Sequence, residues 1–271
     1  MTLLVTGARG KIARAVSTSL IAADRELRIG SREPSAVPAV PGATVVEYDA
    51  TDPAAALDGI TQVFLYSDLD SAPAFVAAAE AAGVKQVVLL SSLSAADGPD
   101  DPHAKTERVI ASGSYATTRL QPGAFMSNAK YWSHQVRATG QIRLPYLDAE
   151  EAPIHERDIA DAAVRVLLDG PGNGHDGRGY PMTGPESMTR RHQIGLVTAV
   201  TGVPIEAVDL TPDEARAEMQ MRDEGQRETL LAYWASRVGT PATIEPGVEL
   251  LTGRTGRTFT TWLADNPGLF T

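Results

Sequence analysis

Cysteine is absent from all 271 residues of this chain, which excludes disulfide bonds, cysteine-ligated metals and a cysteine nucleophile. Long apolar runs are also absent, so the sequence offers no candidate membrane span. Basic runs are missing, and a net charge of −10 argues against nucleic acid or an anionic membrane as a partner. No secretory leader pattern precedes the first predicted strand, and we expect a cytoplasmic location.

A glycine-rich loop lies close to the N-terminus. The apolar run 3–5 leads into Thr6-Gly-Ala-Arg-Gly10, and a helical pattern follows at once. Gly7 permits a tight turn, Gly10 lets the backbone approach a phosphate, and the N-terminus of the helix attracts the anion. This order predicts a dinucleotide-binding loop whose contacts to the pyrophosphate come from Thr6, Gly7, Ala8, Arg9, Gly10, Lys11 and Ile12. A triphosphate-binding P-loop is excluded, because Gly10-Lys11 is followed by Ile12.

Strand-like and helix-like patterns alternate through the first half of the chain. Strands are expected at residues 3–5, 27–29, 44–48, 62–66, 86–90 and 116–120, and helices at 12–22, 53–57, 72–82 and 104–112. Strands separated by helices indicate βαβ units and a parallel sheet. Further helices are expected at residues 158–168, 189–201, 212–222 and 224–238, with Asp158 as the N-cap of the first of these. The Gly-rich loop 170–179 is the linker candidate.

The pattern predicts an α/β fold of the Rossmann type, a doubly wound parallel sheet with a smaller, mainly helical C-terminal part. Residues 1–150 are expected to form the NAD(P)-binding domain. Residues 151–271 are expected to form a substrate-binding part packed on that domain, with the chain interleaving in a single compact unit.

The end of the second strand indicates which dinucleotide is bound. NAD-specific sites carry an acidic residue there, whereas this strand ends in Gly30-Ser31-Arg32. Arg32 lies 22 residues beyond Gly10, about where the discriminating residue belongs. Ser31 and Arg32 offer a hydroxyl and a planar cation to a 2′-phosphate, so NADP(H) is expected in preference to NAD(H). Asp49 and Ala50, which follow the third strand, are expected beside the adenine.

Polar residues also follow the fourth and fifth strands. Open parallel sheets bind ligands at the carboxyl ends of their strands. Further cofactor contacts are therefore expected from Leu65, Tyr66, Ser67, Ser91 and Ser92. Serine at a strand end is also an ordinary turn former, and that alternative stays open.

The ordered set of motifs resembles NmrA-like proteins, an atypical short-chain dehydrogenase/reductase group with quinone-oxidoreductase relatives. The matching segments are Thr6-Gly-Ala-Arg-Gly-Lys-Ile12, Val87-Val-Leu-Leu-Ser-Ser92, His103-x-x-Thr106-Glu107, Thr118-Arg-Leu-Gln-Pro-Gly-Ala-Phe-Met-Ser-Asn128 and Glu156-Arg-Asp-Ile-Ala160. The resemblance implies that Pro122, Gly123, Ala124 and Phe125 line the cofactor, that Asn128 faces the active cleft, and that His155 faces it too.

Catalysis departs from the superfamily pattern. Standard members use Tyr-x-x-x-Lys, in which the lysine lowers the pKa of a tyrosine that protonates a carbonyl oxygen. None of the seven tyrosines here has a lysine four residues later. Lys105 stands near the expected place of the lysine and is assigned to the cofactor. His103 is the candidate proton relay, with Asn128 as the second candidate catalytic residue, and hydrogen bonding in the turn is the alternative role for His103.

Hydride transfer needs chiefly the orientation of nicotinamide and acceptor, and an activated acceptor can draw its proton from water. We therefore expect an NADPH-dependent reductase of a quinone or an activated, polycyclic aromatic ketone, with a substrate pocket formed by Tyr131, Trp132, His155 and Tyr233. The alternative is a redox sensor that binds NADP(H) without turnover. The partner is a small carbonyl or quinone molecule, no metal is expected, and a homodimer is the assembly considered.

Overall fold

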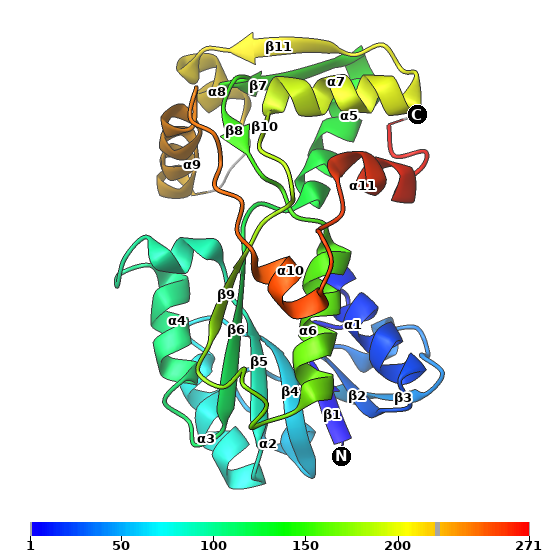
Figure 1. Ribbon diagram of the computed structural model, residues 1–271, viewed down its shortest axis with the longest axis vertical. Coiled ribbons are helices and arrows are strands. Elements are labelled where there is room, and N and C mark those ends of the chain that lie inside the picture. The colour runs from blue at the N-terminus through cyan, green and yellow to red at the C-terminus, as the bar shows by residue number, and fades with distance from the viewer. Residues whose placement is uncertain (1, 220–222, 271) are drawn as a thin grey trace. The chain divides into compact units, whose positions relative to one another are not determined.

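A computed structural model describes residues 2–219 and 223–270 (Figure 1). The strands are β1 (Thr2–Val5), β2 (Glu26–Ser31), β3 (Ala43–Glu47), β4 (Ile60–Tyr66), β5 (Gln86–Leu90), β6 (Ala116–Pro122), β7 (Gln141–Pro145), β8 (Glu150–Glu151), β9 (Gly179–Met182), β10 (Met188–Thr189) and β11 (Glu206–Leu210). The helices are α1 (Lys11–Ala22), α2 (Ala54–Leu57), α3 (Ala72–Ala82), α4 (Pro102–Ile110), α5 (Lys130–Thr139), α6 (Glu156–Asp169), α7 (Arg190–Thr201), α8 (Pro212–Glu218), α9 (Glu224–Ser236), α10 (Gly247–Thr252) and α11 (Phe259–Asp265), with short 3₁₀ turns η1 (Pro34–Ala36), η2 (Leu93–Ala96) and η3 (Met126–Ala129).

The described chain divides into two compact units, between which it passes five times. The first holds the residues up to Gly123 together with Glu156–Met182 and Pro246–Arg254. The second holds Ala124–His155, the described part of Thr183–Glu245, and the chain from Thr255 onward. This division differs from the expected boundary at residue 150, because α6, β9 and α10 belong with the sheet although they come late in the sequence.

The first unit is built on a seven-stranded sheet in the order β3-β2-β1-β4-β5-β6-β9, with every neighbouring pair parallel. Helices α1 and α6 pack together on one face, and α2, α3 and α4 pack on the other (Figure 1). The order reverses between β1 and β4, as in a doubly wound Rossmann sheet, and the predicted fold class is confirmed.

Strand residues alternate between the two faces, and both faces are buried. On β4, Val63 and Leu65 join the core beneath α2–α4, while Phe64 faces the α1 side and is also fully buried. Both faces are apolar because parallel sheets carry helices on each side. The predicted strands fall within one or two residues of β1–β6.

The second unit has its own core, made by α5, α7 and α11 around Trp132, Ile142, Val197 and Trp262. Two small sheets accompany the helices: β7 pairs in parallel with β11, and β8 pairs antiparallel with β10. The unit is therefore less purely helical than expected. Helix α8 ends at Glu218, and residues 220–222 of the expected helix 212–222 lie outside the described residues.

Two local expectations are wrong. The loop 170–178 is not a linker between units, because it lies within the first unit and leads into β9; its Gly177 N–H donates to Thr117 O at 2.7 Å. Asp158 is not an N-cap, because α6 already begins at Glu156. The carboxylate of Asp158 instead accepts a hydrogen bond from Arg254 Nη1 at 3.0 Å within the first unit.

Candidate functional site

Because β1 to β6 are parallel, their carboxyl ends meet along one edge of the sheet, here called the carboxyl edge (Figure 1). The glycine loop follows β1, Ser31 ends β2, Asp49 follows β3, Tyr66 ends β4, and Ser91 follows β5. Residues that are far apart in the sequence are thus brought to one edge at the switch point of the sheet. Ligands of doubly wound folds bind in this crevice.

The glycine loop has the geometry that the sequence predicts. Gly7 has φ +77°, a conformation that strongly favours glycine. Gly10 has φ −73°, so its backbone conformation suits any residue, but an added Cβ would lie 3.2 Å from Gly7 O. Gly10 is also the N-cap of α1 and has no side chain with which to cap it. The loop therefore presents the start of a helix to an anion, and it fits a pyrophosphate.

Tyr66 packs directly on this loop. A Cβ at Gly7 would lie 2.7 Å from Cδ2 of the tyrosine ring, and a Cβ at Gly10 would lie 3.4 Å from its hydroxyl oxygen. Burial raises the pKa of Tyr66 to about 12. The Thr6 Oγ1 hydroxyl links the end of β1 to β4, because it donates to Phe64 O at 3.2 Å and accepts from Tyr66 N at 2.8 Å.

At the tip of β2, Arg32 is exposed, and Ser31 is buried with its Oγ accepting from Glu33 N at 3.1 Å. The Thr51 N–H and hydroxyl donate to Asp49 Oδ1, each at 2.8 Å, and these bonds, with a smaller contribution from the positive charge of Arg32, lower the pKa of Asp49. Ala50 packs at the margin of the core. The structure thus places a cation and an adjacent carboxylate where the adenosine end of a dinucleotide is expected.

The remaining residues at the strand ends differ in whether their side chains are buried or hydrogen-bonded within the protein. The Leu65 side chain lies fully inside the core, so the predicted cofactor contact of Leu65 would have to come from its backbone. Ser92 Oγ caps η2 by accepting from Ser94 N at 3.2 Å, which is the turn-forming alternative. Ser67 Oγ donates to the Asp68 carbonyl at 3.1 Å. Ser91 Oγ donates at 2.5 Å to Oε1 of Glu107, a buried carboxylate on α4.

Glu107 is a residue whose role the sequence did not reveal. Its Oε1 also accepts from Gln121 Nε2 at 2.8 Å, so it joins the ends of β5 and β6 to α4. The signal available in the sequence was an acid next to the apolar residues Ala104 and Ile110 at helical spacing.

Of the two candidate site residues on α4, His103 faces solvent and Lys105 forms an ion pair at the surface. His103 is exposed in the first turn of the helix. Lys105 Nζ lies 3.2 Å from Asp100 Oδ1, and the side chains of both are substantially exposed. Neither position reproduces a lysine that lowers the pKa of a neighbouring tyrosine.

The Pro122–Phe125 segment spans the boundary between the units. Pro122 ends β6, and Gly123 N–H donates to Met182 O at 2.9 Å within the first unit. Ala124 and Phe125 belong to the second unit, where they run beside Ile154, and Asn128 is exposed on η3.

The expected pocket residues of the second unit are not equivalent. Trp132 is buried in the core of that unit and does not form a free aromatic wall, whereas Tyr131 is 78% and Tyr233 is 47% exposed. His155 is buried, and its Nε2 lies 3.3 Å from Asp265 Oδ2 at the end of α11.

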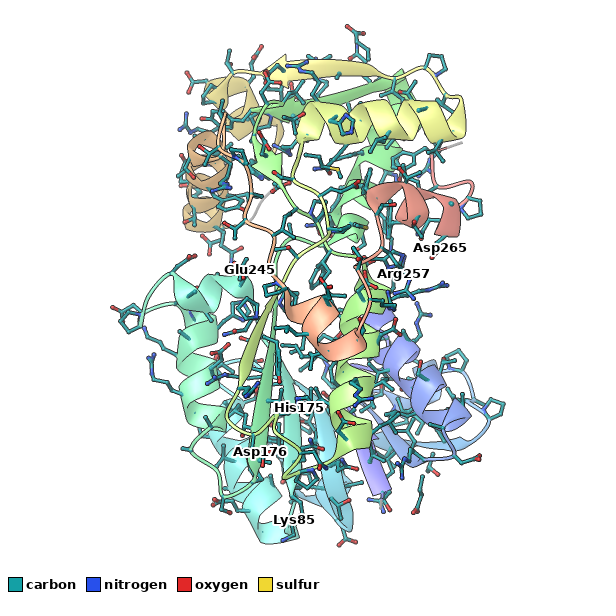
Figure 2. The ribbon with its side chains drawn as sticks, viewed as in Figure 1. Lys85, His175, Asp176, Glu245, Arg257 and Asp265 are labelled. Atoms are coloured by element: carbon teal, nitrogen blue, oxygen red, sulfur yellow. The ribbon has the colours of Figure 1, made fainter. Side chains whose placement is uncertain are left out.

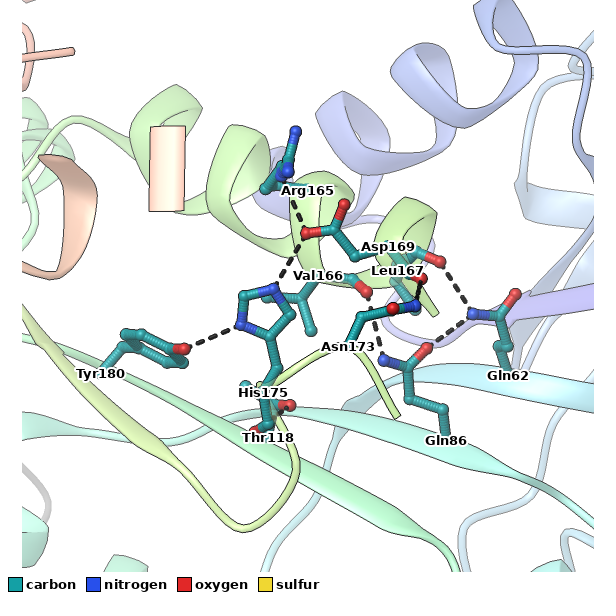
Figure 3. Close-up of polar contacts among 10 residues, drawn as sticks. All are labelled: Gln62, Gln86, Thr118, Arg165, Val166, Leu167, Asp169, Asn173, His175 and Tyr180. Atoms are coloured by element: carbon teal, nitrogen blue, oxygen red, sulfur yellow. Dashed lines mark hydrogen bonds and ion pairs between the residues drawn. The ribbon is translucent and has the colours of Figure 1, made fainter. Parts of the chain in front are cut away.

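The amino ends of the strands, here called the amino edge, carry a polar network that the sequence did not predict. Gln62 Nε2 donates to Gln86 Oε1 at 2.6 Å and to Leu167 O at 2.8 Å, and Gln86 Nε2 donates to Val166 O at 3.1 Å (Figure 3). Both glutamines are buried at the amino ends of their strands. They donate to carbonyls in the last turn of α6, of which Val166 O also accepts from Gly170 N at 3.2 Å.

A second chain of contacts lies beside these glutamines. His175 Nδ1 lies 2.8 Å from the Tyr180 hydroxyl, and its Nε2 lies 2.9 Å from Asp169 Oδ2, which also accepts from Arg165 Nε at 2.8 Å (Figure 3). Thr118 Oγ1 donates to the His175 carbonyl at 3.0 Å. In Figure 2, His175 and Asp176 lie with Lys85 at this amino edge, away from the strand ends that carry the glycine loop.

Two surface pockets of the first unit contain no glycine-loop residue. One, of about 720 Å³, lies between α6, α10 and the loop that carries Asn173 and His175. The other, of about 560 Å³, is lined by the start of α4 and by Glu107 and Arg119. Within residues 2–219 and 223–270, no helix is long and apolar enough to span a membrane, and no cluster of three or more His, Asp and Glu residues is placed to hold a metal.

The family match and the relatives found by comparison with known proteins agree with one another. Residues 7–170 match a family described as NAD(P)H-binding. The chain is 34% identical over 283 residues to (4-alkanoyl-5-oxo-2,5-dihydrofuran-3-yl)methyl phosphate reductase of Streptomyces griseus, covering 99% of each protein. It is 29% identical to the NAD(P)H azoreductase of Xenophilus azovorans, covering 76% of this chain and 75% of that protein.

A solved structure with the same fold is an NADPH-dependent quinone oxidoreductase from Escherichia coli. Its TM-score is 0.80 at 24% identity, with 97% of this chain and 99% of that chain covered. The glycine loop, the parallel sheet and the full-length similarity to a reductase agree with one another. The chain belongs to the NAD(P)H-binding family and is an NAD(P)H-dependent oxidoreductase.

Proposed function

We propose that the chain is an NADPH-dependent reductase of an electron-poor conjugated acceptor, such as a quinone or an unsaturated or aromatic carbonyl compound. The observation that carries this proposal is a dinucleotide loop in a sequence whose seven tyrosines all lack a lysine four residues later. The three tyrosines whose pKa clearly departs from the ordinary value are Tyr48, Tyr66 and Tyr115, and burial raises the pKa of each. A tyrosine that must donate a proton near neutral pH needs the opposite shift.

An electron-poor conjugated acceptor removes the need for such an acid. When bound, NADPH would supply the hydride, and the π electron pair of the acceptor would move onto its oxygen or, in an azo compound, onto the second nitrogen. The resulting anion takes its proton from water. The chain then has to bind and orient both molecules, which by itself can contribute a large part of a rate enhancement. The named relatives support this choice, because a dihydrofuranone bearing an acyl group, an azo compound and a quinone are all conjugated acceptors.

Preference for the 2′-phosphate is a second part of the proposal. Arg32 is exposed directly after the last residue of β2, two residues beyond Gly30, against which Tyr48 packs closely. A guanidinium can bind a phosphate through two hydrogen bonds. The Arg32 side chain is therefore proposed to contact the 2′-phosphate, with Arg9 as a second positive group on the neighbouring loop.

The test is oxidation of NADPH and of NADH by the purified protein with a panel of quinones, unsaturated lactones, azo dyes and simple ketones. We expect turnover with the conjugated acceptors and little with unactivated ketones, and NADPH should be the better donor. Turnover of unactivated ketones alone would contradict the proposal. Tight NADPH binding without turnover of any acceptor would favour the redox sensor instead.

A further inference from the structure

A carboxylate on α4 holds the proton of one hydroxyl at the carboxyl edge. Ser91 Oγ donates to Glu107 Oε1 at 2.5 Å, a distance in the range of charge-assisted O–H···O bonds. The same Oε1 also accepts from Gln121 Nε2 at 2.8 Å, so it serves as an acceptor twice. Ser91 is 9% and Glu107 is 8% exposed, and little water can compete for the contact. The direction of the Ser91 hydroxyl is therefore fixed.

Further contacts hold this arrangement in place. Glu107 Oε2 lies 3.8 Å from Nε of Arg119 on β6, and Arg119 Nη2 donates to Gly177 O at 2.9 Å. The backbone N–H of Ser91 donates to Leu120 O at 2.8 Å, which continues the pairing of β5 with β6. Helix α4 and the ends of two strands are thus bonded together around the hydroxyl.

The Ser91 hydroxyl can offer a ligand only its lone pairs. A serine hydroxyl has one proton and two acceptor lone pairs. The proton is committed to Glu107, and no group within residues 2–219 and 223–270 donates to Ser91 Oγ. Ser91 is therefore able to accept a hydrogen bond from a ligand, but it cannot donate one to the oxygen of a bound substrate without giving up Glu107.

The position of Ser91 in the sheet indicates which part of the dinucleotide it meets. A doubly wound sheet binds the two halves of a dinucleotide on the two sides of its switch point. The strands β2 and β3 lie on the side where the adenosine is expected, whereas β5, which Ser91 follows, lies on the other side of the switch between β1 and β4. Ser91 is accordingly on the side of the nicotinamide half. On that half, the carboxamide NH2 only donates, whereas the ribose hydroxyls can donate or accept, so a fixed acceptor suits the carboxamide.

We propose that Ser91 accepts a hydrogen bond from the carboxamide NH2 of the bound nicotinamide, and that Glu107 is a positioning residue that makes Ser91 an acceptor. The contact would orient the nicotinamide ring for hydride transfer. This inference rests on the NAD(P)H-binding assignment. It also deepens the proposed function, because a serine held in this way leaves the reduced substrate to take its proton from water.

The test compares NADP⁺ with its 3-acetylpyridine analogue, in which a methyl group replaces the carboxamide NH2. Binding of each to the full chain is measured by calorimetry without any substrate. The unmodified protein should prefer NADP⁺ about three- to tenfold, as expected for one neutral hydrogen bond. Ser91→Ala should abolish the preference. Thr118→Val is the matched control and should keep it, because Thr118 Oγ1 is another buried hydroxyl of the first unit and donates to His175 O at 3.0 Å.

Two substitutions of Glu107 distinguish positioning from a purely structural role. Glu107→Gln keeps an oxygen that can accept from Ser91, so it should retain the preference for NADP⁺. Glu107→Leu removes both oxygens and frees the Ser91 proton, so the preference should be lost. In a Ser91→Ala background, Glu107→Leu should have no further effect on the preference. A purely structural role would change the free energy of unfolding and leave the ratio of the two affinities intact.

A folded Ser91→Ala protein that still prefers NADP⁺ would overturn the proposal, and so would an unmodified protein without any preference. Both results are obtained even where Glu107→Leu does not fold. Loss of the preference in Glu107→Gln would show that the charge of Glu107 matters in place of the hydroxyl direction, and would overturn the positioning role. If the preference depends on Ser91 and Glu107 but no acceptor is reduced, the proposed reductase function fails and this inference stands.

Discussion

The amino and carboxyl ends of the strands in the seven-stranded sheet differ in the polar groups they leave open to solvent, although the carboxyl ends also carry the buried Ser91–Glu107–Gln121 contacts. At the amino edge, Gln62, Gln86, Asp169 and His175 bond to one another, to neighbouring side chains and to the last turn of α6. At the carboxyl edge, Arg9 and Arg32 are exposed, and the glycine N-cap of α1 has no side chain. Polar groups paired inside the protein stabilise the fold, whereas groups left facing solvent can bind a ligand.

Residues at the two ends of the strands are therefore expected to affect different properties, the stability of the fold and the binding of the cofactor. Substitutions at the amino edge should change the free energy of unfolding and leave cofactor affinity intact. Substitutions at the carboxyl edge should do the reverse. Four substitutions test this separation, in order of decreasing expected effect.

The largest effect is expected from Gly10→Val. The backbone at Gly10 accommodates valine, but the added carbons would enter the space beside Gly7 O and the Tyr66 hydroxyl. NADPH affinity should fall by a factor on the order of 100 or more. Calorimetric titration measures the affinity, and circular dichroism checks the fold. Gly195→Val, in α7 where a Cβ would meet nothing within 4 Å, is the control. Unchanged affinity in folded Gly10→Val would refute the loop assignment.

Gln86→Leu should have the next largest effect, and it should be on stability. The change leaves one buried Gln62 amide donor without its partner, and the Val166 carbonyl keeps only the bond from Gly170 N–H. We expect a loss of about 1–3 kcal/mol in the free energy of unfolding, measured by urea denaturation. The exposed Gln226→Leu serves as control. A fall in NADPH affinity without a fall in stability would break the distinction between the edges.

Arg32→Ala should have a moderate effect confined to one cofactor. Loss of a charged contact at this exposed position should weaken NADPH binding by about 1–2 kcal/mol, roughly five- to thirtyfold. NADH binding should barely change, because NADH has no 2′-phosphate. Titration of both cofactors measures the difference. Equal weakening of both would show that Arg32 does not recognise the 2′-phosphate.

The smallest effect is expected from Tyr115→Phe. The Tyr115 hydroxyl is buried without a hydrogen-bond partner, and burial raises its pKa, so it is not placed to act as an acid. Activity should stay within about a factor of two of the unmodified protein, since a catalytic tyrosine would lose orders of magnitude. Steady-state kinetics with a quinone decide this. A large loss at any one of the seven tyrosines, with NADPH binding retained, would instead reveal an acid that the sequence spacing conceals.

Much of the carboxyl edge could be predicted because its signals are local. Gly7, Gly10 and the adjoining apolar runs specify strand, turn and helix within thirteen residues, and the parallel topology then places the other strand ends beside them. The amino edge could not be predicted. Gln62 and Leu167 are 105 residues apart, and no local sequence pattern near either residue predicts their contact.

Two further differences have physical reasons. Strand β9 was not predicted because Gly179 and Pro181 are poor strand residues. Pro181 is tolerated because β9 is the last strand of the sheet and has β6 as its strand neighbour. Trp132 was expected to line a substrate pocket, but aromatic residues pack in protein cores as well as in pockets. Burial at 7% exposure shows that packing of the second unit takes precedence.

The passage of the chain between the units has a consequence for its synthesis on the ribosome. Strand β6 is complete at Pro122, but β9, which covers its open edge, ends only at Met182, and α10 follows after Pro246. During translation the nascent sheet therefore exposes an unpaired edge while some sixty further residues emerge, including part of another unit. Such edges recruit strands from other chains. The yield of folded protein should accordingly depend on how quickly the ribosome passes from residue 122 to residue 182.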